Sequence, residues 1–343
     1  MPEPNDCPLD ELDIAILKRL TADGRTRFTE IAEELGVSHK TIRNRYARMQ
    51  RRHSLSITNW LDPKRLGFHA GAQIRFTIET SLLEKAASKI AIYPEVTWMG
   101  MVVGGHNLMA DVWCRNIQHL DDFVGRHLRG IPGVRHMEIA LYSRIHKVAT
   151  LPSLELLECA GTGTYPAEGS GARLPADRPA VGTQETALDR LDIAILEHLS
   201  VDGRKPFTEI AADLDVSHGT VRNRYNRMVE NNVVKVMCWL DNATVGFRVA
   251  AHLDFSIEVP QLEGAAAQIA TFPEVSWLAE VMGQSDLMAD VFCIDTENLN
   301  DVISRRLGQI AGLRHMEVAL YSQVRKITTM PNIELLNRAA QND

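Results

Sequence analysis

The chain has 343 residues, of which 45% are hydrophobic and 24% charged, values that are ordinary for folded domains and exclude an intrinsically disordered chain. Its formal net charge of −7 excludes a general attraction to nucleic acid, so a polyanion has to bind at a local basic surface. No apolar stretch approaches the length of a membrane span, and we expect neither a membrane segment nor a secretory signal. Five cysteines without a CxxC spacing favour a reducing cytoplasm.

The first segment of the chain predicts three helices. Apolar residues at helical spacing follow Asp10, which is placed to cap the first helix. A short break at "DGR" (residues 23–25) leads to a second helix that begins near Phe28. The turn "GVS" follows, and its Ser38 is a good N-cap for the third helix. Two helices joined by a short glycine-containing turn are the signature of a helix-turn-helix.

The third helix has an apolar face and a polar face. Ile42, Tyr46 and Met49 fall at i, i+4 and i+7 and are expected to face the first two helices. Arginine and asparagine on the opposite face suit phosphate anchoring and hydrogen bonding to base edges in a major groove; the alternative is a merely solvated charged surface. The predicted DNA-binding residues, with their counterparts from a second copy of the motif, are Ser38, His39, Lys40, Thr41, Arg43, Asn44, Arg45, Arg48, Ser217, His218, Thr220, Arg222, Asn223, Arg224 and Arg227.

The next segment changes character. Residues 55–68 are expected to form a connecting strand and a turn, and after them the pattern predicts β-α-β-β-α-β, the order of a ferredoxin-like split sheet. The first helix of this β-α-β-β-α-β segment begins at Ser81 with an S-x-x-E sequence, which predicts a capping box. The predicted strands are Ala70–Glu79, Val96–Val103, Leu108–Cys114 and one from Val134, and the second helix is Ile117–Leu128.

The chain then repeats itself. Leu9–Leu157 aligns with Leu188–Leu336 without a gap at a constant offset of 179 residues, and about half of the aligned positions are identical, which indicates a duplication. We call the two parts copy 1 and copy 2 and interpret them as a dimer fused into one chain. The predicted α+β domains are helix-turn-helix domains (9–53, 188–232), connecting strands with hinges (54–68, 233–247), ferredoxin-like effector and assembly domains (69–157, 248–337) and a Gly-, Ala-, Pro- and Thr-rich linker (158–187).

This arrangement closely resembles the Lrp/AsnC family, the feast/famine transcription regulators. The resemblance rests on "LDELDIAIL…DGR…FTEIAEELGVSHKTIRNRYARM", "WLDPKRLGF" and "LRGIPGVRHMEIAL", and it covers both copies. It implies double-stranded DNA as one partner and an amino acid or related small metabolite, sensed by the sheet domains, as another. It also implies dimers, often built into octamers, so that the fused chain corresponds to one family dimer and self-association of chains is expected.

The family's effector loop commonly contains G-x-Y-D between the second and third strands. This chain has "GGHN" in copy 1 and "GQSD" in copy 2, so the tyrosine is missing from both. The hairpin turn is the alternative explanation for the loop glycines. Because the copies differ here, we hypothesise that their effector pockets are no longer equivalent; two identical ligand sites per chain in calorimetry would contradict this. The predicted effector-binding residues are Gly104, Gly105, His106, Asn107, Gly283, Gln284, Ser285 and Asp286.

The two copies also differ in the charge of the third helix. Copy 1 reads "YARMQRRH" where copy 2 reads "YNRMVENN", and Lys40 corresponds to Gly219. Each lost phosphate contact lowers the salt slope of binding by about 0.9. We therefore predict that replacing Arg43 or Arg45 by alanine weakens DNA binding more than replacing the copy 2 equivalents.

An enzyme on the same scaffold is the main alternative. Sirohaem decarboxylases resemble this family and combine a degenerate helix-turn-helix with a sheet domain that handles a tetrapyrrole. His106, His136 and His146 would be the histidines for such a site, but copy 2 has Ser285 and Arg325 at the first and last of these positions. No P-loop, nucleophile elbow or zinc spacing is present, so we predict no catalytic residue, no cofactor and no metal.

A third interpretation is an assembly protein without DNA binding, whose helix-turn-helix units pack against one another. Salt-sensitive retention on heparin or DNA separates that protein from a regulator.

Overall fold

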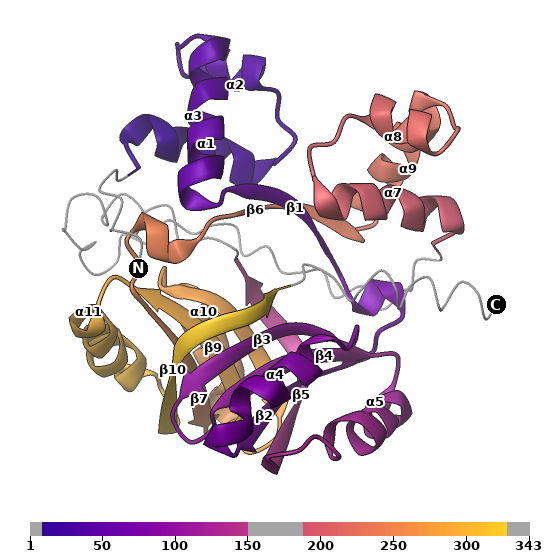
Figure 1. The fold of residues 1–343 in the computed structure, drawn as a ribbon. Coiled ribbons are helices and arrows are strands. Elements are labelled where there is room, and N and C mark those ends of the chain that lie inside the picture. Colours follow the sequence, from indigo (N-terminus) through magenta and orange to yellow (C-terminus); the bar gives the residue numbers. More distant parts are fainter. Residues whose placement is uncertain (1–8, 150–187, 328–343) are drawn as a thin grey trace.

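The computed structural model describes residues 9–149 and 188–327 and has two helix-turn-helix units beside one large barrel (Figure 1). Both predicted copies of the α+β arrangement are present, which confirms the fold class. The predicted linker, 158–187, and the C-terminal ends assigned to the two sheet domains (150–157 and 328–337) lie outside the described residues.

Each helix-turn-helix unit consists of three helices, and the first and third helices begin at side-chain caps, as the sequence predicts for copy 1. The carboxylate of Asp10 accepts a hydrogen bond from the backbone N–H of Asp13, which completes a capping box. Ser38 caps the third helix by accepting the backbone N–H of Thr41. The helices are α1 (Glu11–Ala22), α2 (Phe28–Glu34) and α3 (His39–His53) in copy 1, and α7 (Arg190–Val201), α8 (Phe207–Asp213) and α9 (His218–Glu230) in copy 2.

The connecting strands of the two copies pair with each other. Strands β1 (Ser56–Leu61) and β6 (Val234–Trp239) are antiparallel, with Thr58 opposite its own repeat equivalent, Met237. This places a pseudo-two-fold axis at that pair. Each helix-turn-helix unit therefore packs on the strand of the other copy: Cys238 and Leu240 join the core of the copy 1 unit, and Leu61 joins that of copy 2.

Both sheet domains have the predicted β-α-β-β-α-β order. The predicted capping box at Ser81 is wrong, because Thr80–Leu82 form a short 3-10 turn and the Ser81 hydroxyl donates to Glu79 instead. In copy 1 the elements are β2 (Ala70–Ile78), α4 (Leu83–Ala91), β3 (Val96–Val103), β4 (Leu108–Cys114), α5 (Ile117–Phe123, continued by a π-helical turn to Leu128) and β5 (Val134–Val148). In copy 2 they are β7 (Val249–Ile257), α10 (Leu262–Ala270), β8 (Val275–Met282), β9 (Leu287–Cys293), α11 (Thr296–Asp301, continued by a π-helical turn to Arg306) and β10 (Leu313–Ile327).

The two sheets close into one eight-stranded barrel in the order β10-β3-β4-β2-β5-β8-β9-β7. Two long strands make the closure: β5 pairs with β8, and β10 pairs with β3, both antiparallel. Closure pairs the strand edges that two separate sheets would leave open. The pairing of the copies through their sheets agrees with the interpretation of a fused dimer, whereas the closed barrel is not apparent from the local sequence pattern.

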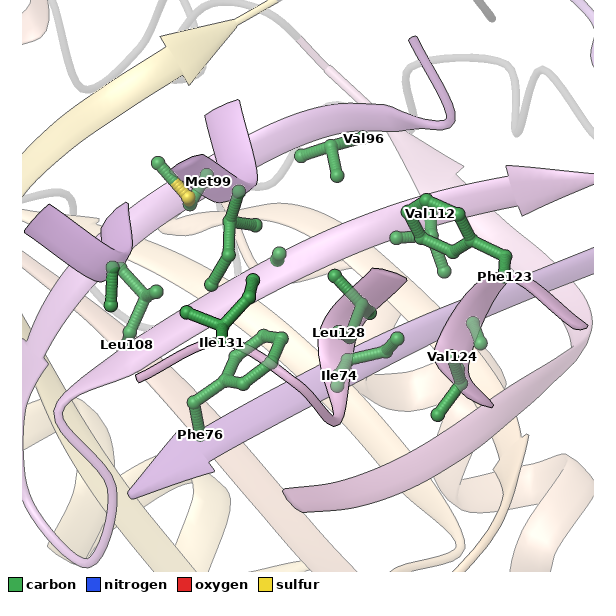
Figure 2. Close-up of a cluster of buried hydrophobic side chains, with 14 of the residues drawn as sticks. Ile74, Phe76, Val96, Met99, Leu108, Val112, Phe123, Val124, Leu128 and Ile131 are labelled. Atoms are coloured by element: carbon green, nitrogen blue, oxygen red, sulfur yellow. The ribbon is translucent and has the colours of Figure 1, made fainter. Parts of the chain in front are cut away.

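The helices cover the outside of the barrel, and each sheet has its apolar core there. Figure 2 shows the copy 1 core, where Ile74 and Phe76 of β2 lie among side chains of β3, β4 and the α5 region. Because side chains alternate along a strand, the residues that alternate with them, Gln73 and Arg75, point to the inside of the barrel. Both are buried there.

Candidate nucleic-acid interface and effector loops

The third helices of the two units, α3 and α9, are the candidate recognition helices, and each buries one face and exposes the other. Ile42 and Met49 are buried in copy 1, as predicted. Lys40, Arg43 and Asn44 are exposed, and α3 contains no acidic residue. In α9 the corresponding exposed residues are Arg222 and Asn223. Each unit thus presents cations and an amide group to solvent from one helix face.

Two of the predicted DNA-binding arginines of α3 are held by carboxylates of the first helix. Arg45 binds Asp10 and Asp13, at 3.1 Å from the Asp13 oxygen, and Arg48 binds Asp13, whose side chain is fully buried. Although burial alone would raise the pKa of Asp10, the hydrogen bond from Arg45 holds that pKa below its usual value. These arginines therefore fasten α3 to α1.

Copy 2 repeats this arrangement with small differences. Arg224 lies 2.5 Å from Asp189 and 3.0 Å from Asp192, and Arg227 lies 2.6 Å from Asp192. The Arg227 side chain is half exposed. Arg227 is the most accessible of the four paired arginines, since the other three are 25 to 30% exposed.

The predicted serine and threonine residues lie at the helix starts. The Ser38 and Thr41 hydroxyls are 2.8 Å apart, and those of Ser217 and Thr220 are 2.9 Å apart. Both serines cap their helices, which explains their presence without a ligand. His39, exposed at the first position of α3, also lies on the open side. The same holds for His218 of α9.

A pair of arginines that the sequence analysis missed joins the two helix-turn-helix units. The guanidinium of Arg25 donates hydrogen bonds to the backbone carbonyls of Gly203 and Lys205, the latter at 3.0 Å. Its Cζ lies 4.1 Å above the ring of Phe207, a cation–π distance. Arg204 makes the reciprocal contacts, donating to Gly24 and Thr26.

The loop that carries Arg204 also lies against the connecting strand β1. The Gly203 N–H donates to the Ile57 carbonyl at 2.9 Å, and a Cβ on Gly203 would stand 2.7 Å from that oxygen. The occurrence of "DGR" in both copies was the signal available in the sequence. We name Arg25 and Arg204 the arginine cross-brace; it holds the two units, and hence the two recognition helices, in one arrangement.

The predicted effector loops lie where the two copies meet at the barrel seams. A Cβ on Gly104 would stand 3.2 Å from Ala319 of β10, and one on Gly283 would stand 3.1 Å from Ala140 of β5. Close approach of a strand from the other copy is therefore a structural reason for both glycines. Gly105 is exposed and has open space beside it, and Gln284 is exposed as well.

The last residue of each loop holds the end of a strand. The Asn107 side chain accepts the Ile78 N–H at 2.9 Å and donates to the Ile78 carbonyl at 2.6 Å. The Asp286 carboxylate accepts the Ile257 N–H at 2.7 Å. Asparagine makes both bonds because it carries a donor and an acceptor, whereas an ionised aspartate only accepts.

The third residues of the two loops converge on one ionic cluster inside the barrel. His106 Nε2 is 3.5 Å from Glu138, and burial lowers the pKa of His106. Ser285, which is buried, donates to Asp254 at 3.0 Å. Arg75 contacts both of these carboxylates. The structure thus connects the differing residues of the two loops through a shared set of charges.

A second set of polar contacts joins a carboxylate to a tyrosine hydroxyl in each copy. The Tyr142 hydroxyl donates to Asp111 at 2.7 Å, and burial raises the pKa of Asp111 to about 7. In copy 2, Asp290 accepts from Tyr321 at 2.6 Å and lies 2.8 Å from His252 Nδ1. Burial disfavours the charged imidazole, but the bond to Asp290 prevails and raises the pKa of His252.

The histidines considered for a tetrapyrrole site do not gather at one place. His136 is exposed on β5, and His146 lies 3.5 Å from Glu280 of the other copy. Within residues 9–149 and 188–327, no group of His, Cys, Asp and Glu has the arrangement of a metal site. No helix in these ranges is long and apolar enough to cross a membrane.

Family models match both copies. The AsnC-type helix-turn-helix domain matches residues 9–50 and 188–229. The Lrp/AsnC ligand binding domain matches residues 71–151 and 249–331. Together the matches cover most of the chain, each domain twice.

Relatives of half this length match along nearly their whole sequence. An uncharacterized HTH-type transcriptional regulator of Pyrococcus horikoshii, PH0140, is 30% identical over 145 residues, 42% of this chain and 92% of that protein. The HTH-type transcriptional regulator Ptr1 of Methanocaldococcus jannaschii is 28% identical over 134 residues, 39% of this chain and 90% of that protein. Among solved structures, the siroheme decarboxylase NirDL matches 96% of this chain and 99% of its own, with a TM-score of 0.63 at 16% identity. That likeness shows the tandem fold alone.

Proposed function

Because this chain belongs to the Lrp/AsnC family of transcriptional regulators, we propose that it binds double-stranded DNA through α3 and α9 and senses a small metabolite through its sheet domains. The carrying observation is the pair of exposed basic helix faces on a chain whose net charge is −7. Local positive charge on an acidic body is the expected footprint of a DNA reader.

The proposal divides the predicted DNA-binding residues into two groups. The exposed ones, Lys40, Arg43 and Asn44 in copy 1 and Arg222 and Asn223 in copy 2, touch the duplex. The ion-paired arginines, such as Arg45, keep the helix oriented and supply at most secondary phosphate contacts. This division is supported by the exposed fractions, since Arg45 is 25% exposed and its guanidinium is already hydrogen bonded.

A paired site on DNA follows from the arginine cross-brace. Two recognition helices held in one arrangement read two half-sites in successive major grooves, about one helical turn apart. The half-sites are unequal, because Lys40 in copy 1 corresponds to Gly219 in copy 2.

The effector part of the proposal places the ligand at the exposed parts of the loops, around Gly105 and Gln284. Support comes from the match of both sheet domains to the Lrp/AsnC ligand binding domain. Self-association of chains, a cytoplasmic location and the absence of catalysis belong to the same proposal. A Soret band in the purified protein would instead indicate a tetrapyrrole enzyme.

Footprinting on the DNA upstream of the protein's own gene tests the proposal, with amino acids and related metabolites added in turn. The expected result is protection of two adjacent half-sites that changes with one class of metabolite. The matched control is Arg43→Ala combined with Arg222→Ala, which removes one exposed cation from each helix and is expected to weaken protection without loss of fold. Failure of the wild-type protein to bind DNA even in dilute salt would overturn the proposal.

A further inference from the structure

Two residues at the same position of the two copies carry opposite charges and touch each other. Arg75 of β2 and Asp254 of β7 are separated by the repeat offset of 179 residues, and the guanidinium donates a hydrogen bond to the carboxylate. Their side chains are only 5% and 12% exposed. The pair therefore lies inside the barrel, where the two sheet domains face each other.

Equivalent residues that touch must lie at the axis that relates the two copies. In a pair of identical copies, a residue at this axis meets itself. If two sheet domains of copy 1 paired with each other, arginine would face arginine. If two sheet domains of copy 2 paired, aspartate would face aspartate. Like charges at hydrogen-bond distance in a buried place are strongly unfavourable, because neither charge is compensated there. The contact is favourable when the two copies differ.

The groups around Arg75 differ from those around Asp254, and each set suits the charge that it surrounds. Arg75 also donates to Gln73 at 3.2 Å and lies 3.4 Å from Glu138. Asp254 accepts from Ser285 at 3.0 Å and lies 3.8 Å from His252 Nε2. Copy 2 has His252 in place of Gln73 and Ser285 in place of His106, while Glu317, the equivalent of Glu138, is 65% exposed. Each copy thus supplies partners suited to its own member of the pair.

We propose that these residues form a heterotypic pairing surface, by which the inner face of sheet domain 1 fits the inner face of sheet domain 2 and neither face fits its own kind. The partner of each sheet domain is a sheet domain with the opposite charge at this position. The chain itself supplies that partner. Barrel closure within one chain then competes favourably with exchange of like domains between chains. The surface also explains why the loops differ at His106 and Ser285, since both residues contact the cluster.

Charge reversal in the full-length chain tests the proposal. Asp254→Arg imitates copy 1 facing itself, Arg75→Asp imitates copy 2 facing itself, and the combined variant exchanges the charges. Each single variant is expected to lower the thermal unfolding midpoint by on the order of 10 °C. The combined variant is expected to recover at least half of the larger loss; recovery stays partial because Glu138 remains beside position 75.

A cross-copy ion pair on the surface provides the control. Glu84 and Arg325 also join the copies, but Glu84 is 72% exposed, so reversal of either charge is expected to shift the midpoint by at most about 3 °C. If a reversed variant does not fold, Arg75→Gln and Asp254→Asn replace the reversals, and their combination is expected to lose less than the sum of the two losses. A combined variant that loses the full sum, in whichever set folds, overturns the proposal.

Discussion

At the scale of single residues, the arginines of α3 divide by their partners. Arg43 is exposed on the open face, whereas Arg45 and Arg48 neutralise the fully buried carboxylate of Asp13. A buried carboxylate that loses a partner costs free energy, because its desolvation is no longer compensated. Residues of one type and one helix therefore serve two purposes, and a change at each is expected to affect a different measurement.

We expect Arg43→Ala to lower the slope of log affinity for DNA against log salt by about 0.9 and to leave thermal stability unchanged. Arg45→Ala is expected to reduce the free energy of unfolding by about 1–3 kcal/mol, because Asp13 keeps Arg48 alone. Binding titrations at several salt concentrations and thermal unfolding of both variants check this. Equal loss of stability in the two variants would contradict the division.

The carboxyl of Asp111 makes stability depend on pH. Burial raises its pKa from 3.8 to about 7, so the folded state favours the neutral acid and stability falls as the pH rises from about 4 to 7. His252, whose pKa Asp290 raises despite burial, loses its contribution as the pH rises further. Asn cannot ionise, so we expect Asp111→Asn to reduce the loss of folding free energy between about pH 4 and 7, by up to about 4 kcal/mol. Unfolding midpoints between pH 4 and 8 measure it, and the control is Asp122→Asn, since the Asp122 side chain is 45% exposed. Parallel curves for wild type and Asp111→Asn would count against the effect.

At the scale of elements, the arrangement of α3 and α9 depends on elements of the opposite copy. Each helix-turn-helix unit packs on the other copy's connecting strand, and the arginine cross-brace places Arg25 on Phe207 and Arg204 on Phe28. A mobile pair of units adapts to several half-site spacings, whereas a braced pair accepts one. Under the proposed function, the brace therefore influences which DNA sites are bound, although it does not touch the DNA.

We expect Arg25→Ala combined with Arg204→Ala to weaken binding at the preferred half-site spacing by about tenfold, equivalent to 1.4 kcal/mol, and to reduce discrimination between spacings. Anisotropy titrations on duplexes whose half-sites differ in separation measure this. The control is Arg27→Ala in the same segment, since Arg27 is 82% exposed and pairs locally with Glu30. Unchanged discrimination in the double variant would show that the brace does not set the spacing.

At the scale of the whole molecule, fusion lets two similar copies differ where a homodimer cannot. The differences fall on the recognition helices, on the effector loops and on the buried pair of Arg75 and Asp254. Under the proposed function, a chain with one basic and one less basic third helix binds an oriented, unequal site.

A reciprocal exchange tests the inequality of the two DNA contacts. We expect Lys40→Gly to lower the salt slope by about 0.9 and Gly219→Lys to raise it by the same amount, because each change removes or adds one phosphate contact. Gly219 accepts a side chain, since a Cβ there meets nothing closer than the Ser217 hydroxyl at 3.6 Å. Slopes from titrations on one operator check both variants. Unchanged slopes would place these positions away from the phosphates.

The sequence by itself determined the parts of this protein that depend on neighbouring residues. Capping at Asp10 and Ser38 and the strand bounds of β3 and β4 agree with the prediction because helix and strand periodicity and caps are local. The sequence repeat predicted the two copies, and the spacing of apolar residues in α3 predicted which of its faces is exposed. The capping box at Ser81 failed because Glu79 competes for the serine hydroxyl.

Tertiary structure decided the rest. The closed barrel, the pairing of β1 with β6, the cross-brace and the contact of Arg75 with Asp254 all join segments about 130 or more residues apart, most of them near the repeat offset. Local periodicity places a charged residue on a face of an element, but it does not say which distant group that face meets. For Arg45 and Arg43, this distinction separates an arginine that holds the fold from one that is exposed for the proposed contact with DNA.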